Sequence, residues 1–331
     1  MRTIGCPVRD AYPGGKATRR FSRSKPIAVL LSLLILAGSL VMAACSSEPA
    51  PTNTDYPLTI TDSLGRTVQF DQIPERIVTT HPTSTEVLYC AGGLPVGCDA
   101  TSKYPPDAEG LPTVGSAFYL SVEAIAGLQP DLIIIEALTQ ARYLSSLAPL
   151  GVPVIAVRAA CLDDVVDSLT LVGQIIDKNE EAATSVATIR DRIDAAQSTC
   201  TSGKSILVLI ADDKSNIYAS REDSYPGTIA ALLGLENLAA DLPESGPYAG
   251  FALLSSEQAV TMDPDVIFTI TPSPAAPKLS TLLPSLPVYK DRSAVKEGRI
   301  VELDSSLFLM AQGPRIATAV EGMLESMNGY A

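Results

Sequence analysis

Short apolar runs alternate with longer amphipathic stretches along most of the chain. Six of these runs are nearly continuous in apolar and β-branched residues, which is typical of strands buried in a parallel sheet. They span residues 76–80, 132–135, 154–157, 206–210, 266–270 and 300–303. Helical patterns lie between them, at residues 83–91, 162–176, 180–198 and 314–327. The alternation predicts an α/β fold with open, parallel-type central sheets.

Local signals indicate where two of these helices begin. Thr83 and Glu86 have the spacing of a capping box, in which two side chains satisfy free backbone N–H groups at a helix start. Pro314 stands where a proline suits the first helical turn.

One segment occurs twice, at an offset of 134 residues. Each copy reads as a short helix, a Pro-Asp pair and a buried strand. The recurring residues are Leu120, Ser121, Glu123, Pro130, Asp131 and Ile133 in the first copy and Leu254, Ser255, Glu257, Pro264, Asp265 and Ile267 in the second. The repeat predicts two similar Rossmann-like lobes, at residues 56–177 and 205–331, bridged by one long α-helix within residues 178–204.

The N-terminus has the order of an export signal. Four basic residues between Arg19 and Lys25 precede an apolar run that ends in Ala43-Ala44-Cys45. Small residues before a cysteine resemble a lipoprotein cleavage site, so we interpret residues 1–45 as a lipoprotein signal peptide with a lipidated Cys45. An ordinary signal peptide and a single spanning helix are the alternatives. Residues 46–57 are polar and Pro-rich, as expected of a flexible tether.

Charge narrows the choice of partners. Without residues 1–44 the chain keeps 17 basic and 36 acidic residues, a net charge of −19. Nucleic acid and anionic lipid surfaces are poor partners for such a protein, whereas a cationic ligand or a basic protein surface suits it. The alternative is an acidic surface that only keeps an exported protein soluble.

Once Cys45 is assigned to the lipid, four cysteines remain in the exported part, and an even number suggests disulfides. Cys90 closes a predicted helix and Cys98 lies on the next extended segment, so a local bridge is feasible. Cys161 and Cys200 would meet across an antiparallel pair of helices. No two cysteines have the C-x-x-C spacing, which argues against zinc.

Four motifs in order resemble a known family. They are Asp62-Ser63-Leu64-Gly65-Arg66, the segment from Pro74-Glu75-Arg76 to Thr85-Glu86-Val87-Leu88, the doubled S-x-E…P-D-x-I segment, and Ala311-Gln312-Gly313-Pro314-Arg315. Together they resemble the periplasmic binding proteins of iron–siderophore, haem and cobalamin importers. The resemblance implies that a chelate containing iron or cobalt binds in a cleft between two lobes and is delivered to an ABC permease and its ATPase. It also implies a monomer that is exported and held by a lipid at the outer face of the cytoplasmic membrane.

The resemblance assigns Glu123 and Glu257 to permease docking, one glutamate on each lobe. Each follows a serine that caps its helix, so each carboxylate is also favoured locally by the helix dipole. That local benefit is the alternative explanation for both residues.

No set of residues predicts an active site. His81 is the one histidine, and neither a G-x-S-x-G motif nor a phosphate-binding loop occurs. A binding protein with no cofactor of its own is therefore expected, and a surface-anchored adhesion or signalling module is the alternative from another class. Asp212 and Asp213 follow a strand and would either face the cleft or form a solvated turn.

Residues after the strands are expected to line the cleft, since open α/β sheets bind ligands at the carboxyl ends of their strands. Aromatic and arginine side chains suit a large chelate with acidic edges, which ranks ferric siderophores first, cobalamin or another corrinoid second, and haem third. His81 would ligate haem iron or have no ligand role. The candidates are His81, Tyr104, Phe118, Tyr119, Arg142, Tyr143, Arg158, Tyr218, Arg221, Tyr225, Tyr248, Phe251 and Phe308.

Overall fold

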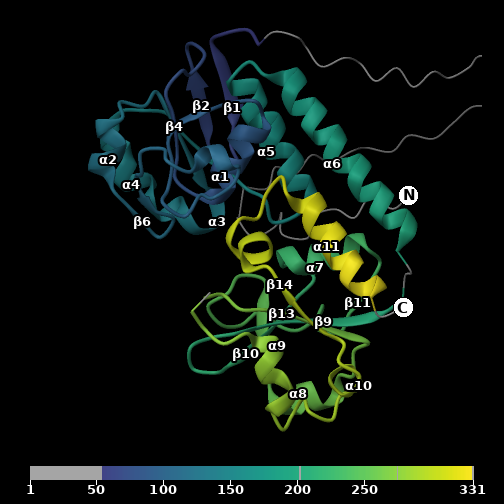
Figure 1. The fold of residues 1–331 in the computed structure, drawn as a ribbon. Helices are drawn as coiled ribbons and strands as arrows, with labels where there is room; N and C mark the ends of the chain where they lie inside the picture. Colours follow the sequence, from purple (N-terminus) through teal and green to yellow (C-terminus); the bar gives the residue numbers. More distant parts are fainter. Residues whose placement is uncertain (1–53, 201–202, 274, 330–331) are drawn as a thin grey trace, which may run out of the picture.

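Two sheets, each covered by helices, make up most of the computed structural model, which describes residues 54–200, 203–273 and 275–329 (Figure 1). Cys45 and residues 46–53 of the predicted tether lie outside these residues. No helix within the described ranges is long and apolar enough to cross a membrane.

The N-terminal lobe is built on a four-stranded parallel sheet of order β4-β3-β7-β8. The strands are β3 (Ile77–Thr79), β4 (Pro95–Gly97), β7 (Leu132–Glu136) and β8 (Val154–Val157). Two small hairpins flank it, β1 (Leu58–Thr61) with β2 (Thr67–Phe70), and β5 (Gly115–Ser116) with β6 (Tyr119–Leu120). The helices are α1 (Pro82–Cys90), α2 (Val122–Gly127), α3 (Ala137–Gln140), α4 (Leu144–Leu147) and α5 (Leu162–Ile175).

The C-terminal lobe has a sheet with the path β12-β10-β9-β13-β14, and β11 also pairs with β9. Its strands are β9 (Ser205–Ala211), β10 (Ile217–Ser220), β11 (Glu236–Asn237), β12 (Phe251–Leu253), β13 (Val266–Ile270) and β14 (Ile300–Leu303). Its helices are α7 (Tyr225–Leu232), α8 (Ser256–Thr261), α9 (Leu279–Leu282), α10 (Ser293–Lys296) and α11 (Ile316–Asn328). β10 is antiparallel to β9 and to β12, so this sheet is mixed rather than purely parallel.

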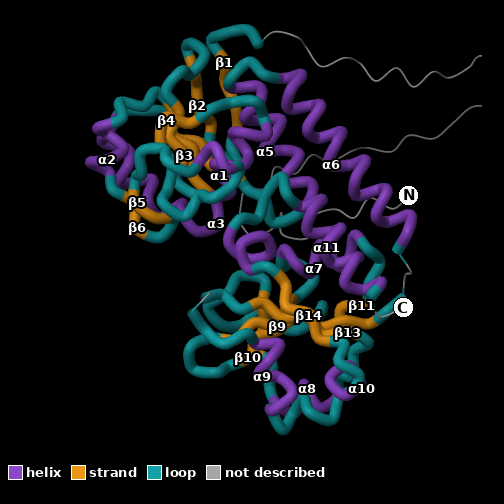
Figure 2. The backbone as a smooth tube through the Cα atoms, viewed as in Figure 1, coloured by secondary structure: helices purple, strands orange, loops and turns teal. Residues whose placement is uncertain are grey.

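One long helix, α6 (Asn179–Thr199), runs beside both lobes, as predicted (Figures 1 and 2). Alternate residues of the strands point to opposite faces. Leu132 and Ile134 of β7 join a central core that includes α1, α5, α6, α7 and α11, whereas Ile133 and Ile135 join a separate outer core. The central core contains residues of both lobes, so the lobes share one continuous hydrophobic core.

The repeated segment folds in the same way in both lobes. Ser121 caps α2 by accepting from the Ala124 N–H, and Ser255 caps α8 by accepting from the Gln258 N–H. The aspartate after each helix accepts a hydrogen bond from the backbone of the neighbouring strand or of the residue just before it. Asp131 accepts from the Arg76 N–H at 2.8 Å before β3, and Asp265 accepts from the Ser205 N–H at 2.8 Å at the start of β9.

Two predicted helix starts are wrong. His81, not Thr83, caps α1: its Nδ1 accepts from the Thr83 N–H at 3.2 Å, while Ser84 Oγ accepts from the His81 N–H at 3.1 Å. Glu86 turns away from the helix start to an arginine of the other lobe. α11 begins at Ile316 with Arg315 as its N-cap, so Pro314 precedes the helix instead of opening it.

Candidate ligand-binding site

The carboxyl ends of the strands lie toward the boundary between the lobes. Ala160, three residues after β8, accepts a hydrogen bond from Thr228 Oγ1 of α7 at 3.3 Å. At the same boundary Glu86 of α1 pairs with Arg315, which precedes α11. The loops after the strands are therefore positioned to form a site between the lobes, as the general rule for open α/β sheets predicts.

His81 is buried at the end of β3, where it begins α1. Because its Nδ1 accepts a hydrogen bond from a backbone N–H, that nitrogen has no proton, and the neutral ring carries its proton on Nε2. Burial lowers the pKa of His81, and the opposing effects of the Glu136 and Asp99 carboxylates are smaller. A ring in this state donates from Nε2 and does not offer Nε2 as a metal ligand.

An aromatic edge stands at the β5–β6 hairpin. Tyr119 is 82% exposed, and Phe118 in the turn is also exposed. The Phe118 carbonyl accepts from the Tyr143 hydroxyl and from Arg142 Nη2, the latter at 3.2 Å. The Arg142 guanidinium also stacks on the Tyr143 ring, with its Cζ 4.9 Å from the ring centroid. The structure thus brings these four predicted residues together.

The other predicted arginines already have partners. Arg158 Nε lies 3.1 Å from Asp164 Oδ2. Arg221 Nη1 lies 3.2 Å from Asp223 Oδ2 and 3.7 Å from Glu244 Oε2. Internal carboxylates therefore neutralise both guanidinium groups.

The aromatic candidates of the C-terminal lobe mostly pack in its core. Tyr218, Tyr225, Phe251 and Phe308 are all buried, and their role in lining the cleft stays a prediction. Tyr218 and Tyr248 meet edge to face at 5.4 Å between ring centroids, and Tyr248 meets Phe251 at 6.3 Å. Tyr248 is half-buried and is the accessible end of this row.

Tyr104 and the Asp212-Asp213 pair, the remaining candidates from the sequence, lie in different surroundings. Tyr104 is exposed and lies under the Arg315 guanidinium, 4.7 Å from Cζ to the ring centroid. Asp212 accepts hydrogen bonds from Lys214, Asn216 and Tyr218 and so closes the β9–β10 turn, which favours the turn interpretation of Asp212-Asp213.

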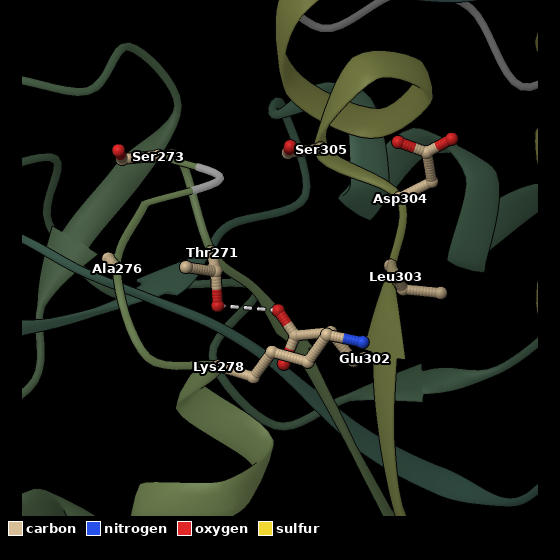
Figure 3. Close-up of a pocket in the computed structure, with 8 residues that line it drawn as sticks. All are labelled: Thr271, Ser273, Ala276, Lys278, Glu302, Leu303, Asp304 and Ser305. Atoms are coloured by element: carbon tan, nitrogen blue, oxygen red, sulfur yellow. Dashed lines mark hydrogen bonds between the residues drawn. The ribbon is translucent and has the colours of Figure 1, made fainter.

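A polar pocket of about 350 Å³ opens at the carboxyl ends of β13 and β14 (Figure 3). It is lined by Thr271, Ser273, Ala276, Lys278, Glu302, Leu303, Asp304 and Ser305. None of these residues was among the candidates from the sequence, which were aromatic, arginine and histidine side chains. Their position directly after two predicted strands was the signal that would have identified them.

Glu302 organises one wall of this pocket. It accepts from Thr271 Oγ1 at 2.6 Å, from Thr269 Oγ1 at 2.8 Å and from the Ser280 N–H at 3.0 Å. Partial burial alone would raise the pKa of Glu302, but the hydrogen bonds from Thr271, Ser280 and Thr269 outweigh it and lower the pKa. Figure 3 shows the Thr271 hydroxyl directed at this carboxylate, with Asp304 and Ser305 on another wall.

Glu123 and Glu257 are both exposed, each in the first turn of its helix, one in each lobe. Apart from Ser121 Oγ, at 3.4 Å from Glu123 Oε2, no hydrogen bond or ion pair within the described residues involves either carboxylate.

The predicted disulfides do not form, since Cys90, Cys98 and Cys200 are free thiols. Cys90 lies beside Ser185 of α6, whereas Cys98 Sγ faces the Ala108 carbonyl at 3.7 Å, so the two thiols point to different elements. In the described part of the chain no group of His, Cys, Asp and Glu residues has the arrangement of a metal site.

Comparison with known proteins identifies the class. The pattern of the periplasmic binding protein family matches residues 77–307, and the chain belongs to this family, whose members are transport binding proteins and not enzymes. A cobalamin-binding protein of Halobacterium salinarum is 26% identical over 322 residues, covering 94% of this chain and 84% of its own. The probable siderophore-binding lipoprotein YfiY of Bacillus subtilis is 26% identical over 310 residues, covering 87% and 94%.

Solved structures agree on the fold. The periplasmic heme-binding protein RhuT from Roseiflexus sp. RS-1 matches with a TM-score of 0.66 at 25% identity, over 77% of this chain and 98% of its own. The periplasmic vitamin B12-binding protein BtuF of Vibrio cholerae matches with a TM-score of 0.63 at 24% identity, over 78% and 98%. The two-lobe prediction of the fold is confirmed.

Proposed function

We propose that this protein is an extracytoplasmic substrate-binding protein of an ABC importer and that it captures a neutral or cationic metal chelate, a corrinoid first. The observation that supports this choice of ligand is that three arginines near the boundary between the lobes form ion pairs within the protein. Arg158, Arg221 and Arg315 are each paired with a carboxylate of the protein itself. Ferric catecholates and haem present anionic groups that are bound best by unpaired guanidinium or ammonium groups. Among the described residues near the strand ends, Arg142 at the β5–β6 hairpin and Lys278 in the polar pocket have no carboxylate partner, so the choice rests on the pairing of Arg158, Arg221 and Arg315.

The polar pocket supports the same choice. A carboxylate has about four lone-pair positions, and Thr269, Thr271 and Ser280 donate to those of Glu302, which lowers its pKa and favours the charged form at the wall of the pocket. Asp304 adds a second carboxylate, and Ser273 and Ser305 add hydroxyl groups. The amide side chains of a corrin ring both donate and accept hydrogen bonds, which suits this lining.

The geometry of His81 argues against haem. Axial ligation requires an unprotonated Nε2, but the capping bond to Thr83 places the proton on that nitrogen. Ligation would therefore break the cap of α1. This argument and the paired arginines keep haem third.

A ferric siderophore is the second candidate, supported by the probable siderophore-binding relative. The sequence alone ranked it first because it counted the arginines as free. Their pairing reverses the order and favours, among siderophores, a cationic hydroxamate chelate over an anionic catecholate.

We also propose attachment through a lipid on Cys45. The support is the signal pattern before Cys45 and the Bacillus subtilis relative YfiY, which is named as a lipoprotein. Replacing Cys45 by Ser should release the protein from the membrane fraction, and mass spectrometry of the N-terminal peptide would identify the acyl groups. Unchanged fractionation of the Ser variant would contradict the proposal.

The experiment for the ligand is a melting-temperature panel on the purified protein. The probes are cyanocobalamin, ferrioxamine B, ferric enterobactin and haemin. A ligand that binds only the folded state raises the melting temperature by mass action. We expect shifts with the first two probes and no chemical conversion of any. Shifts confined to ferric enterobactin or haemin would refute the proposed ligand class.

A further inference from the structure

Two sequence motifs that lie far apart in the chain meet at one ion pair. Glu86 comes from α1 in the N-terminal lobe, and Arg315 comes from the segment before α11 in the C-terminal lobe, 229 residues away. Arg315 Nε donates to Glu86 Oε2 at 2.9 Å, and Arg315 Nη2 donates to Glu86 Oε1 at 2.7 Å. Two parallel bonds of this kind define the orientation of both groups as well as their distance.

The pair is enclosed by residues of both lobes. The Glu86 side chain is 3% exposed and that of Arg315 is 18% exposed. Tyr104 of the N-terminal lobe lies against one face of the guanidinium, at 4.7 Å. Tyr225 of the C-terminal lobe is fully buried within electrostatic reach of both charges, and its hydroxyl lies against the Gly313 backbone without a hydrogen bond of normal geometry.

A second Arg–Glu pair in the same molecule shows how unusual this environment is. Arg192 of α6 binds Glu321 of α11 with the same two-bond geometry, at 2.9 and 2.6 Å. Its side chains are 41% and 43% exposed, so water solvates both charges when the pair opens. Glu86 and Arg315 have no such alternative while the lobes stay in place. Separating them leaves two poorly solvated charges, which is strongly unfavourable.

We propose that Glu86 and Arg315 are positioning residues that latch the two lobes in the orientation that captures the chelate. The latch sets ligand affinity without touching the ligand, because a protein that spends part of its time in a non-capturing orientation binds more weakly by that fraction. The geometry of the latch is independent of the ligand, whereas its effect on affinity rests on the function proposed above.

Four single variants of the full chain test the latch. Glu86→Gln keeps the shape of the side chain but leaves the Arg315 charge uncompensated. Arg315→Lys keeps the charge but loses the planar fork and its contact with Tyr104, and it remains informative if Glu86→Gln fails to fold. Glu321→Gln breaks the exposed pair between Arg192 of α6 and Glu321 of α11 and is the matched control. Tyr225→Phe removes the unpartnered hydroxyl and should leave the latch intact.

Two readouts separate a latch from a general loss of stability. Hydrogen–deuterium exchange of the ligand-free protein should rise at α1 and at the start of α11 in Glu86→Gln, less in Arg315→Lys, and remain unchanged in both lobes' sheets. Calorimetric titration with cyanocobalamin should give about tenfold weaker binding for Glu86→Gln at a temperature where the protein is folded. Glu321→Gln and Tyr225→Phe should match the wild type in both.

Unchanged exchange at α1 and α11 in both Glu86→Gln and Arg315→Lys would overturn the latch, and so would an equal change in Glu321→Gln. Raised exchange with unchanged affinity would overturn its role in capture. If cyanocobalamin and ferrioxamine B fail to bind the wild type, the proposed ligand class fails, while the exchange experiment still decides whether the latch exists.

Discussion

The two sheets end in opposite ways at the boundary between the lobes. In the N-terminal lobe, Gln140 fills the edge of the sheet formed by the carboxyl ends of β3 and β7. Its Oε1 accepts from Thr80 Oγ1 and the Glu136 N–H, and its Nε2 donates to the Thr80 and Ala117 carbonyls. In the C-terminal lobe, Glu302 binds several groups at the edge formed by the carboxyl ends of β13 and β14, and a polar pocket lies open beside it.

The difference follows from charge. A neutral amide can be buried completely when all of its donors and acceptors are paired, as those of Gln140 are. A carboxylate is costly to bury, and Glu302 stays partly accessible at the wall of the pocket. We infer that the N-terminal edge mainly holds the structure together and that the C-terminal edge contributes more to recognition.

Removing the closed edge should have the largest effect. Gln140→Ala leaves the Thr80 and Ala117 carbonyls and the Glu136 N–H without their partner, so we expect a loss of about 3 kcal/mol in the free energy of unfolding. Urea denaturation measures this loss. Gln140→Glu is the control that keeps the size but places a charge in a buried site, and it should be at least as damaging. A loss below about 1 kcal/mol would mean that the edge is not closed in solution.

The two exposed glutamates should matter for delivery and not for capture. Replacing both Glu123 and Glu257 by Ala should reduce cellular uptake about tenfold, more than either single change, because two contacts on one rigid body act as a bivalent attachment. Lys substitutions should be worse than Ala if the permease offers arginines. Ligand affinity should stay unchanged and stability should change by less than about 1 kcal/mol. Normal uptake by the double Ala variant would leave only the local helix benefit.

Removing the negative charge of Glu302 from the pocket should have a moderate effect on stability and on ligand affinity. Glu302→Gln weakens the bonds from Thr269, Thr271 and Ser280, and we expect a stability loss of about 1 kcal/mol. Affinity for cationic ferrioxamine B should fall about fivefold, and affinity for neutral cyanocobalamin should fall less. Lys278→Ala in the same pocket is the control of opposite charge. Equal losses for both ligands would assign Glu302 a purely structural role.

His81 should give the smallest effect, visible as a pH dependence. Burial lowers the pKa of folded His81 below that of the unfolded chain, so the unfolded state binds more protons as the pH falls below about 6.5. Stability should therefore decline from pH 7 downward, by less than about 1.4 kcal/mol per pH unit for this one group. His81→Asn keeps a capping side chain but cannot titrate, and melting curves from pH 7.5 to 5.5 should be flatter for it. Equal slopes would contradict a neutral buried ring.

The fold could be predicted because burial leaves a strong periodic signal. The apolar runs at 154–157, 266–270 and 300–303 coincide with β8, β13 and β14, and the repeated segment revealed the two lobes. The antiparallel β10 was missed because Ile217–Ser220 follows a polar turn and is not a continuous run of aliphatic residues. The helix starts were misjudged because the pairing of Glu86 with Arg315 competes with local capping, and residue spacing contains no information about a partner 229 positions away.

The candidate site was less predictable for the same reason. Loop position after a strand identified where a site would lie, but it could not show that Arg158 and Arg221 are paired or that Tyr225 and Phe308 are buried. The sequence-based candidates were chosen among aromatic, arginine and histidine residues and therefore did not include Thr271, Glu302 and Asp304. Their role depends on which polar groups lie close together in space.

Calorimetric titration of the purified protein with cyanocobalamin and with ferric enterobactin tests the central claim most directly. If paired arginines and an acidic pocket define the site, cyanocobalamin binds saturably with a single site per chain, and ferric enterobactin gives no saturable heat. Saturable binding of the anionic catecholate, with none of cyanocobalamin, would contradict the account.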